Sequence, residues 1–244
     1  MQGITMITAG KGGVGKSTCT AILGHCLANL GKKVLLIEFD MGLRSLDIML
    51  GAENKAVYDL SDIVKGNCTA KEALIQCDSC ENLSLLVASN DCDFDIDITD
   101  FAIVLKSVYD EFEYILIDTP AGLGSLVKLA AQVCDNAIIV ATPDPVCVRD
   151  GGKCVDTLRR WGVDNMRLII NRASEKPDKK APIRDYDEII DTVGARLIGV
   201  VPEDKNIARN LYKGIPIGGE SLSKEAFKNI AKRFLGNDIS LLIK

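Results

Sequence analysis

Short runs of aliphatic and β-branched residues recur along this chain, and between them lie longer stretches in which apolar residues repeat every three or four positions. The short runs predict strands and the longer stretches predict helices. The expected strands are residues 4–8, 34–38, 83–88, 114–117, 137–141, 167–170 and 197–201. The expected helices are residues 16–30, 99–111, 123–133, 146–161 and 222–235. Strands that alternate with helices predict an α/β fold, with a mostly parallel, twisted sheet of about seven or eight strands and helices on both faces.

Length, composition and charge are those of an ordinary globular protein. The 244 residues predict one domain, residues 1–236, followed by a short tail, residues 237–244. Hydrophobic residues make up 47%, and no stretch approaches the roughly 18 uncharged apolar residues that span a bilayer. The N-terminus carries no basic and then apolar leader, so the chain is expected to stay in the cytoplasm. With 29 basic against 34 acidic residues, the net charge of -5 argues against nucleic acid as a partner.

The nine cysteines are scattered through apolar runs, which is typical of reduced thiols in a core rather than of a disulfide framework. Only Cys77 and Cys80 form a tight pair. A C-x-x-C without a second matching pair does not predict a zinc site.

Two charged stretches predict surface structure. Residues 174–182 are expected to form a solvated loop. The aspartates of residues 91–100 resemble a calcium loop, but Ile96 stands where a glycine should turn the chain and Ala102 where a glutamate should close the shell. This stretch is therefore expected to cap a helix that begins near residue 99 or 100.

The sharpest chemical signal is GKGGVGKS at residues 10–17, which fits G-x-x-x-x-G-K-[ST] at every fixed position. It follows an expected strand and opens an expected helix, as a phosphate-binding loop does. Glycines let successive backbone N–H groups point at phosphate oxygens, and the helix N-terminus adds positive potential. Lys16 is expected to lie on the β- and γ-phosphates. The expected nucleotide-binding residues here are Gly10, Lys11, Gly12, Gly13, Val14, Gly15, Lys16, Ser17 and Thr18.

Carboxylates follow two of the expected strands. Asp118 ends one apolar strand, and the strand that ends in Glu38 brings Asp40 to the same carboxyl edge of the sheet, where ligands bind in open α/β folds. In-line phosphoryl transfer needs an oriented nucleophile, so Asp40 is the candidate for positioning the attacking water and, with Lys16, for catalysis. Ser17, Asp40 and Asp118 are the expected magnesium ligands.

The sequence also predicts which nucleotide base is bound. Guanine-binding proteins use N-K-x-D after a strand, and the only Asn-Lys pair here, in NKAV at residues 54–57, lacks the aspartate. ATP is therefore expected rather than GTP.

The phosphate loop differs from an ordinary Walker A sequence at Lys11, an extra lysine directly after the first glycine. It resembles the deviant Walker A ATPases, the group that contains MinD, ParA and the nitrogenase iron protein. Flanking segments resemble the MinD branch and run in the family's order from about residue 3 to residue 235. They are DMGLRSLD at 40–47, VYD at 57–59, DTPAG at 118–122, VRD at 148–150 and VVPED at 200–204.

The resemblance implies a nucleotide-driven switch. In the family, ATP brings two subunits face to face, and the signature lysine, here Lys11, reaches the partner's phosphates and acts in catalysis. The segments that begin at Asp40 and Asp118 match the family's two switches, and Gly42 and Gly122 allow their backbones to rearrange.

The resemblance also implies a base site and partner proteins. The residues that match the adenine-contacting pair and the loop beside the base are Asn171, Arg172, Pro202, Glu203 and Asp204. By itself, Asn171 is also typical of a turn at a strand end. Asp150 falls where the family binds its activator and inhibitor, so regulators similar to MinC and MinE are expected partners, together with a second copy of this chain.

MinD proteins usually end in a basic amphipathic helix that docks on anionic lipid. The last expected helix here, residues 222–235, has one apolar stripe and matches the family's final core helix, so it is expected to pack on the sheet. Residues 237–244 then offer four apolar residues and one lysine, a marginal anchor that would depend on dimerisation. The protein is expected in the cytoplasm, with at most peripheral contact with the inner face of the cell membrane.

The expected function is a magnesium-dependent ATPase switch that dimerises with ATP, dissociates on hydrolysis and helps to place the division septum. A ParA-like or flagellum-positioning ATPase for other cargo is the alternative. An ATP-dependent iron–sulfur electron donor would need a cysteine soon after Asp118, but residues 119–124 contain none, which leaves Cys92 and Cys134 as conceivable ligands. A scaffold that binds ATP without turnover is the third class.

Overall fold

A central sheet organises the protein. The computed structural model describes residues 3–41, 44–78, 80–91, 93–174, 185–214, 216 and 218–242. Within them, eight strands form one sheet in the order β3-β4-β2-β5-β1-β6-β7-β8. The strands are β1 (Gly3–Thr8), β2 (Val34–Glu38), β3 (Ile75–Gln76), β4 (Leu83–Leu86), β5 (Tyr114–Asp118), β6 (Asn136–Ala141), β7 (Asn165–Ala173) and β8 (Arg196–Pro202). All neighbours pair in parallel except β3 and β4, so the expected fold class is confirmed.

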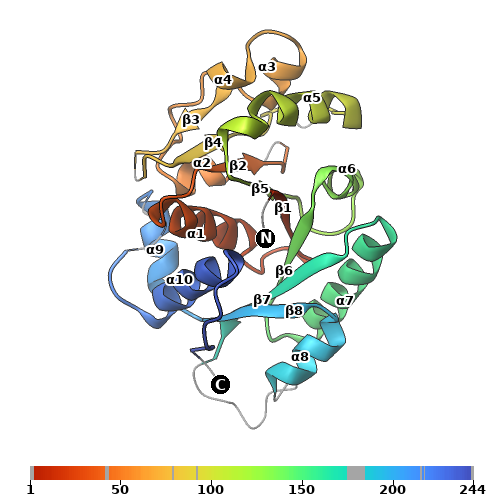
Figure 1. Ribbon diagram of the computed structural model, residues 1–244, viewed down its shortest axis with the longest axis vertical. Coiled ribbons are helices and arrows are strands. Elements are labelled where there is room, and N and C mark those ends of the chain that lie inside the picture. Colours follow the sequence, from red (N-terminus) through yellow and green to blue (C-terminus); the bar gives the residue numbers. More distant parts are fainter. Residues whose placement is uncertain are drawn as a thin grey trace.

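Helices cover both faces of this sheet. They are α1 (Lys16–Asn29), α2 (Leu46–Met49), α3 (Leu60–Val64), α4 (Ala70–Ala73), α5 (Ile98–Val108), α6 (Ser125–Val133), α7 (Pro145–Arg160), α8 (Tyr186–Val193), α9 (Lys205–Tyr212) and α10 (Leu222–Phe234), and a 3₁₀ turn, η1 (Tyr109–Glu111), follows α5. Figure 1 shows α1, α9 and α10 on one side of the strands and α6, α7 and α8 on the other, with α3, α4 and α5 beyond β3 and β4.

The strand order places the phosphate loop at the centre of the molecule. From β1 the chain builds the sheet outward in both directions, through β5, β2 and β4 on one side and β6, β7 and β8 on the other. Such a switch point opens a crevice at the carboxyl ends of the strands. In the parallel registers Ile7 and Glu38 both pair with Asp118, so the ends of three strands meet beside the loop that follows β1.

Local structure differs from the sequence prediction where the signals are short. The two-residue strand β3 and the helices α2, α3, α4, α8 and α9 were not predicted, because four to eight residues give too little periodicity to distinguish from a loop. Strand β7 extends to Ala173, beyond the predicted end at residue 170. Most of the predicted loop, residues 175–182, lies outside the described residues.

The aspartate-rich stretch behaves as predicted. Asp97 is the N-cap of α5, and its side chain accepts a hydrogen bond of 2.9 Å from the backbone N–H of Asp100. The helix begins at Ile98, one residue before the predicted start, because the capping carboxylate is the one at position 97.

The last helix packs on the sheet, as predicted. Helix α10 lies against β8 and α1 and buries its apolar stripe. The stripe contains Ala226, Phe227, Ile230, Ala231 and Phe234. Over the described part of the chain, no helix combines the length and the apolar character that crossing a membrane would need.

Candidate nucleotide site

The phosphate loop leaves the start of α1 open to a ligand. Gly13 and Gly15 have positive φ values of 79° and 89°, which side chains rarely allow, and Gly15 is the N-cap of α1. Among the described residues no side chain caps this end, and the first turn of the helix carries no acidic residue. The free N–H donors and the positive helix end therefore suit an anion such as phosphate.

Two glycines of the loop lie too close to other elements to carry side chains. A Cβ on Gly10 would collide with the backbone of Asp150, which lies in α7. A Cβ on Gly15 would collide with the side-chain amide of Asn171, which lies in β7. Elements remote in the sequence therefore hold the loop from both sides.

A buried ion pair lies directly below the loop. The Lys16 ammonium is 2.9 Å from Asp118 Oδ1, and the two side chains are 8% and 0% exposed. The Thr20 hydroxyl also donates to Asp118 Oδ1, at 2.8 Å. The other oxygen, Asp118 Oδ2, is buried and has no hydrogen-bond partner among the described residues. Such an atom costs free energy unless a ligand satisfies it, so the site is incomplete without one.

Two of the expected magnesium ligands, Ser17 and Asp118, lie beside the Lys16 ammonium. Ser17 Oγ lies 3.2 Å from the Lys16 ammonium, which itself contacts Asp118. Burial raises the pKa of Asp40, the Lys16 charge opposes that rise, and the Asp118 charge adds to it, so Asp40 lies within the electrostatic reach of both. Hydroxyl and carboxylate oxygens are the donors that Mg²⁺ prefers beside phosphates, so this donor set fits that ion.

Lys11 makes a long contact at the surface. Its ammonium is 3.8 Å from Asp144 Oδ1, and both side chains are about half exposed, at 51% and 49%. Asp144 is the N-cap of α7 and accepts a 2.9 Å bond from the N–H of Cys147. An exposed pair of this length holds a lysine weakly, so Lys11 is free to exchange Asp144 for another anion.

The residues matched to base binding share one pocket with the phosphate loop. The pocket has a volume of about 700 Å³. Its walls are Gly15, Thr18, Ser45, Ile48, Met49, Asn171, Arg172, Pro202, Glu203, Asp204, Lys205, Ile207, Ala208, Leu211 and Tyr212. Its apolar wall, from α2 and α9, was missed by sequence reasoning because neither helix was predicted.

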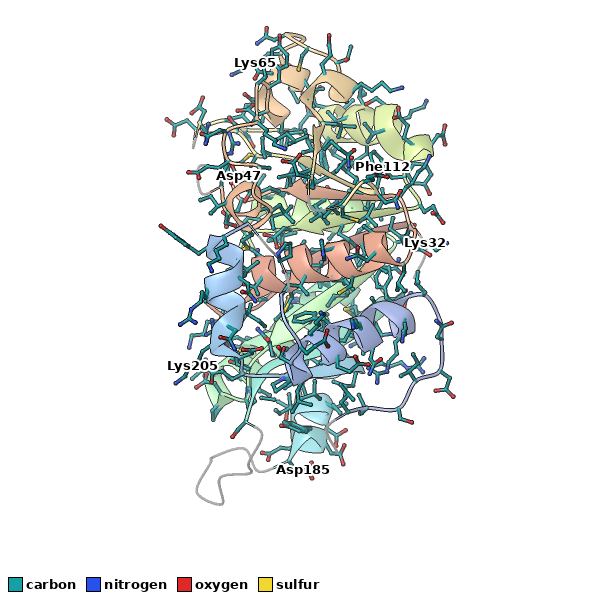
Figure 2. The ribbon with its side chains drawn as sticks, turned by 90° about the vertical axis from the view of Figure 1, so that its left-hand side faces the viewer. Lys32, Asp47, Lys65, Phe112, Asp185 and Lys205 are labelled. Atoms are coloured by element: carbon teal, nitrogen blue, oxygen red, sulfur yellow. The ribbon has the colours of Figure 1, made fainter. Side chains whose placement is uncertain are left out.

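Helices α2 and α9 can meet because glycines follow them. A Cβ on Gly214 would lie 2.8 Å from the backbone nitrogen of Gly51, so the two turns approach too closely for side chains. Figure 2 turns α1, α9 and α10 toward the viewer and labels Asp47, from α2, and Lys205, from α9, along the same edge of that face.

Asn171 does more than end a strand. Its side-chain Nδ2 donates a buried 2.8 Å hydrogen bond to the carbonyl oxygen of Val14, in the phosphate loop. Because the amide nitrogen is used there, the amide oxygen is the atom left to accept from a ligand in the pocket. The next residue, Arg172, has a positive φ of 54°, which is uncommon outside glycine and frequent at functional sites.

The two acidic residues of the loop after β8 differ in their surroundings. Glu203 is exposed at the pocket. The Asp204 carboxylate is engaged in structure, because it caps α9 through the N–H of Asn206 at 2.9 Å and accepts from the Ser223 hydroxyl. The Ser223 bond, with the cap, lowers the pKa of Asp204. Asp204 thus shapes the pocket wall with a carboxylate that already has partners.

Glu38 is fully buried and its role was not predicted. Its Oε1 accepts hydrogen bonds from the N–H and hydroxyl of Ser45 and from the N–H of Leu46, while Oε2 is buried without a partner in the described structure. Burial raises the pKa of Glu38 to about 7, although the Leu46 and Ser45 N–H groups oppose the rise.

The cysteines give no support to a cluster. Eight of them are free thiols, and Cys92 lies outside the described residues. Burial raises the pKa of Cys134 to about 12, which disfavours the thiolate that a metal requires. In the described ranges no group of three or more His, Cys, Asp or Glu side chains could hold a metal ion.

Comparison with known proteins identifies the family. The ParA family model, described as NUBPL iron-transfer P-loop NTPase, matches residues 1–235. The septum site-determining protein MinD of Synechocystis sp. is 38% identical, over 99% of this chain and 92% of its own length. The MinD of Bacillus subtilis is 35% identical, over 98% of this chain and 91% of its own length.

Solved structures agree with these relatives. A chain of the MinC:MinD cell division complex of Aquifex aeolicus superposes with a TM-score of 0.90 at 34% identity, over 98% of both chains. MinD of Pyrococcus horikoshii, complexed with Mg-ADP, superposes with a TM-score of 0.84 at 30% identity, over 95% of both chains. The chain therefore belongs to the MinD family of septum site-determining P-loop ATPases.

Proposed function

We propose that this chain is a magnesium-dependent ATP switch that dimerises with ATP, dissociates on hydrolysis and acts in placing the division septum. The observation that carries this proposal is the buried Lys16–Asp118 pair, with its unsatisfied Asp118 oxygen, directly below an uncapped helix N-terminus and beside a 700 Å³ pocket. Such an arrangement suits a nucleotide whose phosphates lie on the loop and whose base lies in the pocket.

Each side chain has a defined role in this proposal. The backbone of residues 10–18 binds the phosphates, and Lys16 leaves Asp118 to contact the β- and γ-phosphate oxygens. Ser17, Asp40 and Asp118 would hold the magnesium ion, which when bound would supply positive charge against the phosphates. Asp40 orients the attacking water, whose oxygen bonds to the γ-phosphorus of ATP as the bond from that phosphorus to the β-phosphate oxygen breaks, which gives ADP, phosphate and a proton.

The base site supports adenine. The Asn171 amide oxygen, oriented by the bond from Nδ2 to Val14, can accept from the exocyclic amine of adenine. Guanine carries a carbonyl at that position. Its oxygen and the Asn171 amide oxygen are both acceptors and would face each other, so the oriented amide discriminates against guanine. Arg172, Pro202, Glu203 and Asp204 complete the walls around the base.

The partners follow from surface position. Lys11 is exposed at the mouth of the loop, where it can reach a second copy of the chain. The MinC:MinD complex of Aquifex aeolicus supports a MinC-like partner here. We place the contact with that partner and with a MinE-like activator on α7 around Asp150, whose carboxylate lies between Arg149 and Lys153 at 3.2 Å and 3.5 Å.

Residues 1–236 form the ATPase domain in this proposal, and residues 237–244 form a tail.

Calorimetry and phosphate release test the function. Titration of Mg-ATP or Mg-ADP into the protein is expected to release heat with one site per chain, and GTP is expected to bind more weakly. Phosphate release from ATP is expected to depend on magnesium and to rise with protein concentration, because the active form is a dimer. Absence of heat with both adenine nucleotides would contradict the proposal, and binding without phosphate release would identify a scaffold instead.

We further propose that the protein works in the cytoplasm and touches the inner membrane face through the tail. Arg233 holds the tail beside β8, since its guanidinium donates to the carbonyls of Ile239, at 2.8 Å, and Ser240, at 2.6 Å. Leu241 and Leu242 are 39% and 45% exposed. Each tail is a weak anchor, and a dimer would present two of them.

Liposome sedimentation tests this location. With anionic vesicles, the protein is expected to pellet in ATP and much less in ADP, and deletion of residues 237–244 is expected to abolish pelleting while ATP-dependent dimers persist. Equal pelleting in both nucleotides, or no loss on deletion, would exclude the tail as an ATP-controlled anchor.

A further inference from the structure

Glu38 holds a segment that lies next to the proposed reaction centre. It is the last residue of β2, 0% exposed, and pairs in register with Asp118 of β5. One of its oxygens accepts three hydrogen bonds from two consecutive residues: the N–H of Ser45, the Ser45 hydroxyl at 3.2 Å and the N–H of Leu46 at 3.0 Å. A buried acceptor with three donors is a strong local anchor.

These bonds take the place of an ordinary helix cap. Ser45 is the N-cap residue of α2, but its own side chain makes no capping bond. The carboxyl of Glu38, seven residues earlier, accepts the first N–H groups of α2 instead. Helix α2 contributes Ile48 and Met49 to the wall of the pocket, so Glu38 connects the central sheet to that wall.

Asp40 lies in the chain between Glu38 and the residues that Glu38 holds. On its amino-terminal side, the Phe39 N–H donates to the carbonyl of Asp118 at 2.9 Å, and the Phe39 ring stacks on Phe101 with a centroid distance of 4.5 Å. On its carboxyl-terminal side, the described contacts to the sheet are those of Ser45 and Leu46 with Glu38. Asp40 therefore lies between two sets of hydrogen bonds to the sheet. Those on its carboxyl-terminal side all reach Glu38, while α2 itself also packs against α1 and α9.

We propose that Glu38 is a positioning residue for ATP hydrolysis, which holds the 44–47 segment on the sheet and thereby keeps Asp40 in place at the carboxyl ends of β2 and β5. This rests on the proposed function, in which Asp40 orients the attacking water. The contacts require an acceptor oxygen rather than a second carboxylate oxygen, because all three bonds reach Oε1 and Oε2 has no partner in the described structure.

Three substitutions of Glu38 separate the acceptor from the charge. Glu38→Gln keeps an amide oxygen that can accept the same bonds. Glu38→Ala removes the acceptor. Glu38→Asp keeps the charge but shortens the side chain by one methylene, which takes the acceptor out of reach of Ser45 and Leu46. We expect ATP turnover to fall at least about tenfold in Glu38→Ala and Glu38→Asp, because small misplacements of a catalytic group cost one to two orders of magnitude.

The affinity for ADP without magnesium is expected to change less than about threefold in all three variants, because most of the pocket lies on β7, β8 and α9 and binding without the ion needs neither Asp40 nor the oriented water. Glu38→Gln is expected to keep turnover within about threefold of wild type. Hydrogen exchange gives a readout that is independent of activity: the amides of residues 45 and 46 should exchange faster in Glu38→Ala than in wild type and stay slow in Glu38→Gln.

Glu72 provides a control for the loss of a capping carboxylate at an exposed position. Its carboxylate also accepts from a backbone N–H and a hydroxyl, those of Thr69, both at 2.8 Å, and it also caps a four-residue helix, α4. Helix α4 contributes no residue to the pocket. Glu72→Ala is expected to lose its helix cap without loss of turnover, so it tests whether the loss of a capping carboxylate away from the pocket is enough to lower turnover.

The outcomes are distinct. Wild-type turnover in Glu38→Ala, or equal loss in Glu38→Gln and Glu38→Ala, would overturn the positioning role. If Glu38→Ala does not fold, the comparison of Glu38→Asp with Glu38→Gln decides, and turnover in Glu38→Asp at the level of Glu38→Gln would contradict the proposal. If wild type itself releases no phosphate, the proposed function fails, while the exchange rates at residues 45 and 46 still report whether Glu38 holds the segment.

Discussion

Lys11→Ala is expected to leave nucleotide bound while it abolishes ATP-dependent dimers and lowers hydrolysis by about three orders of magnitude, the effect of removing a cationic group supplied to the transferred phosphoryl. The side chain is half exposed and its one described ion pair, with Asp144, is 3.8 Å long. Its removal therefore costs the monomer little stability. The loss would instead appear in the assembled state, where the lysine neutralises charge on the partner's nucleotide.

Light scattering with ATP and a phosphate-release assay measure these two effects on the same sample. Lys32→Ala is a suitable control, because Lys32 is also a partly exposed lysine in an ion pair, 2.9 Å from Glu113. Its partner Glu113 directly precedes β5, so the pair lies at the opposite, amino-terminal end of the parallel strands. Wild-type turnover in Lys11→Ala, or an equal loss in Lys32→Ala, would refute the assigned role.

Lys16→Met is expected to remove nucleotide binding and also to destabilise the protein without ligand. The ammonium is the cation paired with a carboxylate that is 0% exposed. Methionine fills most of the space of the lysine stem but leaves Asp118 without a compensating charge. Breaking a buried pair in this way costs about 3–5 kcal/mol of unfolding free energy. Chemical denaturation measures the stability, and calorimetry with Mg-ADP measures the binding.

The double variant Lys16→Met, Asp118→Asn separates these two losses. Asparagine keeps an oxygen that can accept the 2.8 Å bond from Thr20 and removes the unpaired charge. Most of the lost stability should therefore return. Nucleotide binding should not return, because the Lys16 ammonium that contacts the phosphates is still missing. A double variant that binds ADP as wild type does would show that Lys16 has no part in the site. One as unstable as Lys16→Met would show that the charge of Asp118 is not the cause.

Elements whose signals are local could be predicted closely. Helix α1 begins at Lys16 and β2 spans Val34–Glu38, as expected, because a glycine-rich loop, an apolar run and a turn each act over a few neighbouring residues. The predicted capping of a helix by the aspartate-rich stretch is a local signal too, because the Asp97 bond reaches only three residues along the chain.

Contacts between distant segments could not be predicted. The bond from Asn171 to Val14 joins residues 157 positions apart, and the pair of Lys16 and Asp118 joins residues 102 positions apart. Sequence pattern placed Lys16 and Asp118 at the same sheet edge, but the partners of these side chains depend on strand order and register. Glu38 is an example. The sequence showed that it lies at a strand end, but its hydrogen bond with the Ser45 N–H depends on the path of the chain between these two residues.

By itself the sequence determined the α/β class, the phosphate loop and the family, because these rest on periodicity and on a motif whose residues are neighbours in the chain. The tertiary structure decided which atoms face one another: the unsatisfied oxygen of Asp118, the wall of α2 and α9, and the anchoring of α2 by Glu38. The physical reason is range, since backbone propensities act over a few residues, whereas packing and hydrogen bonding across the sheet are set by the whole fold.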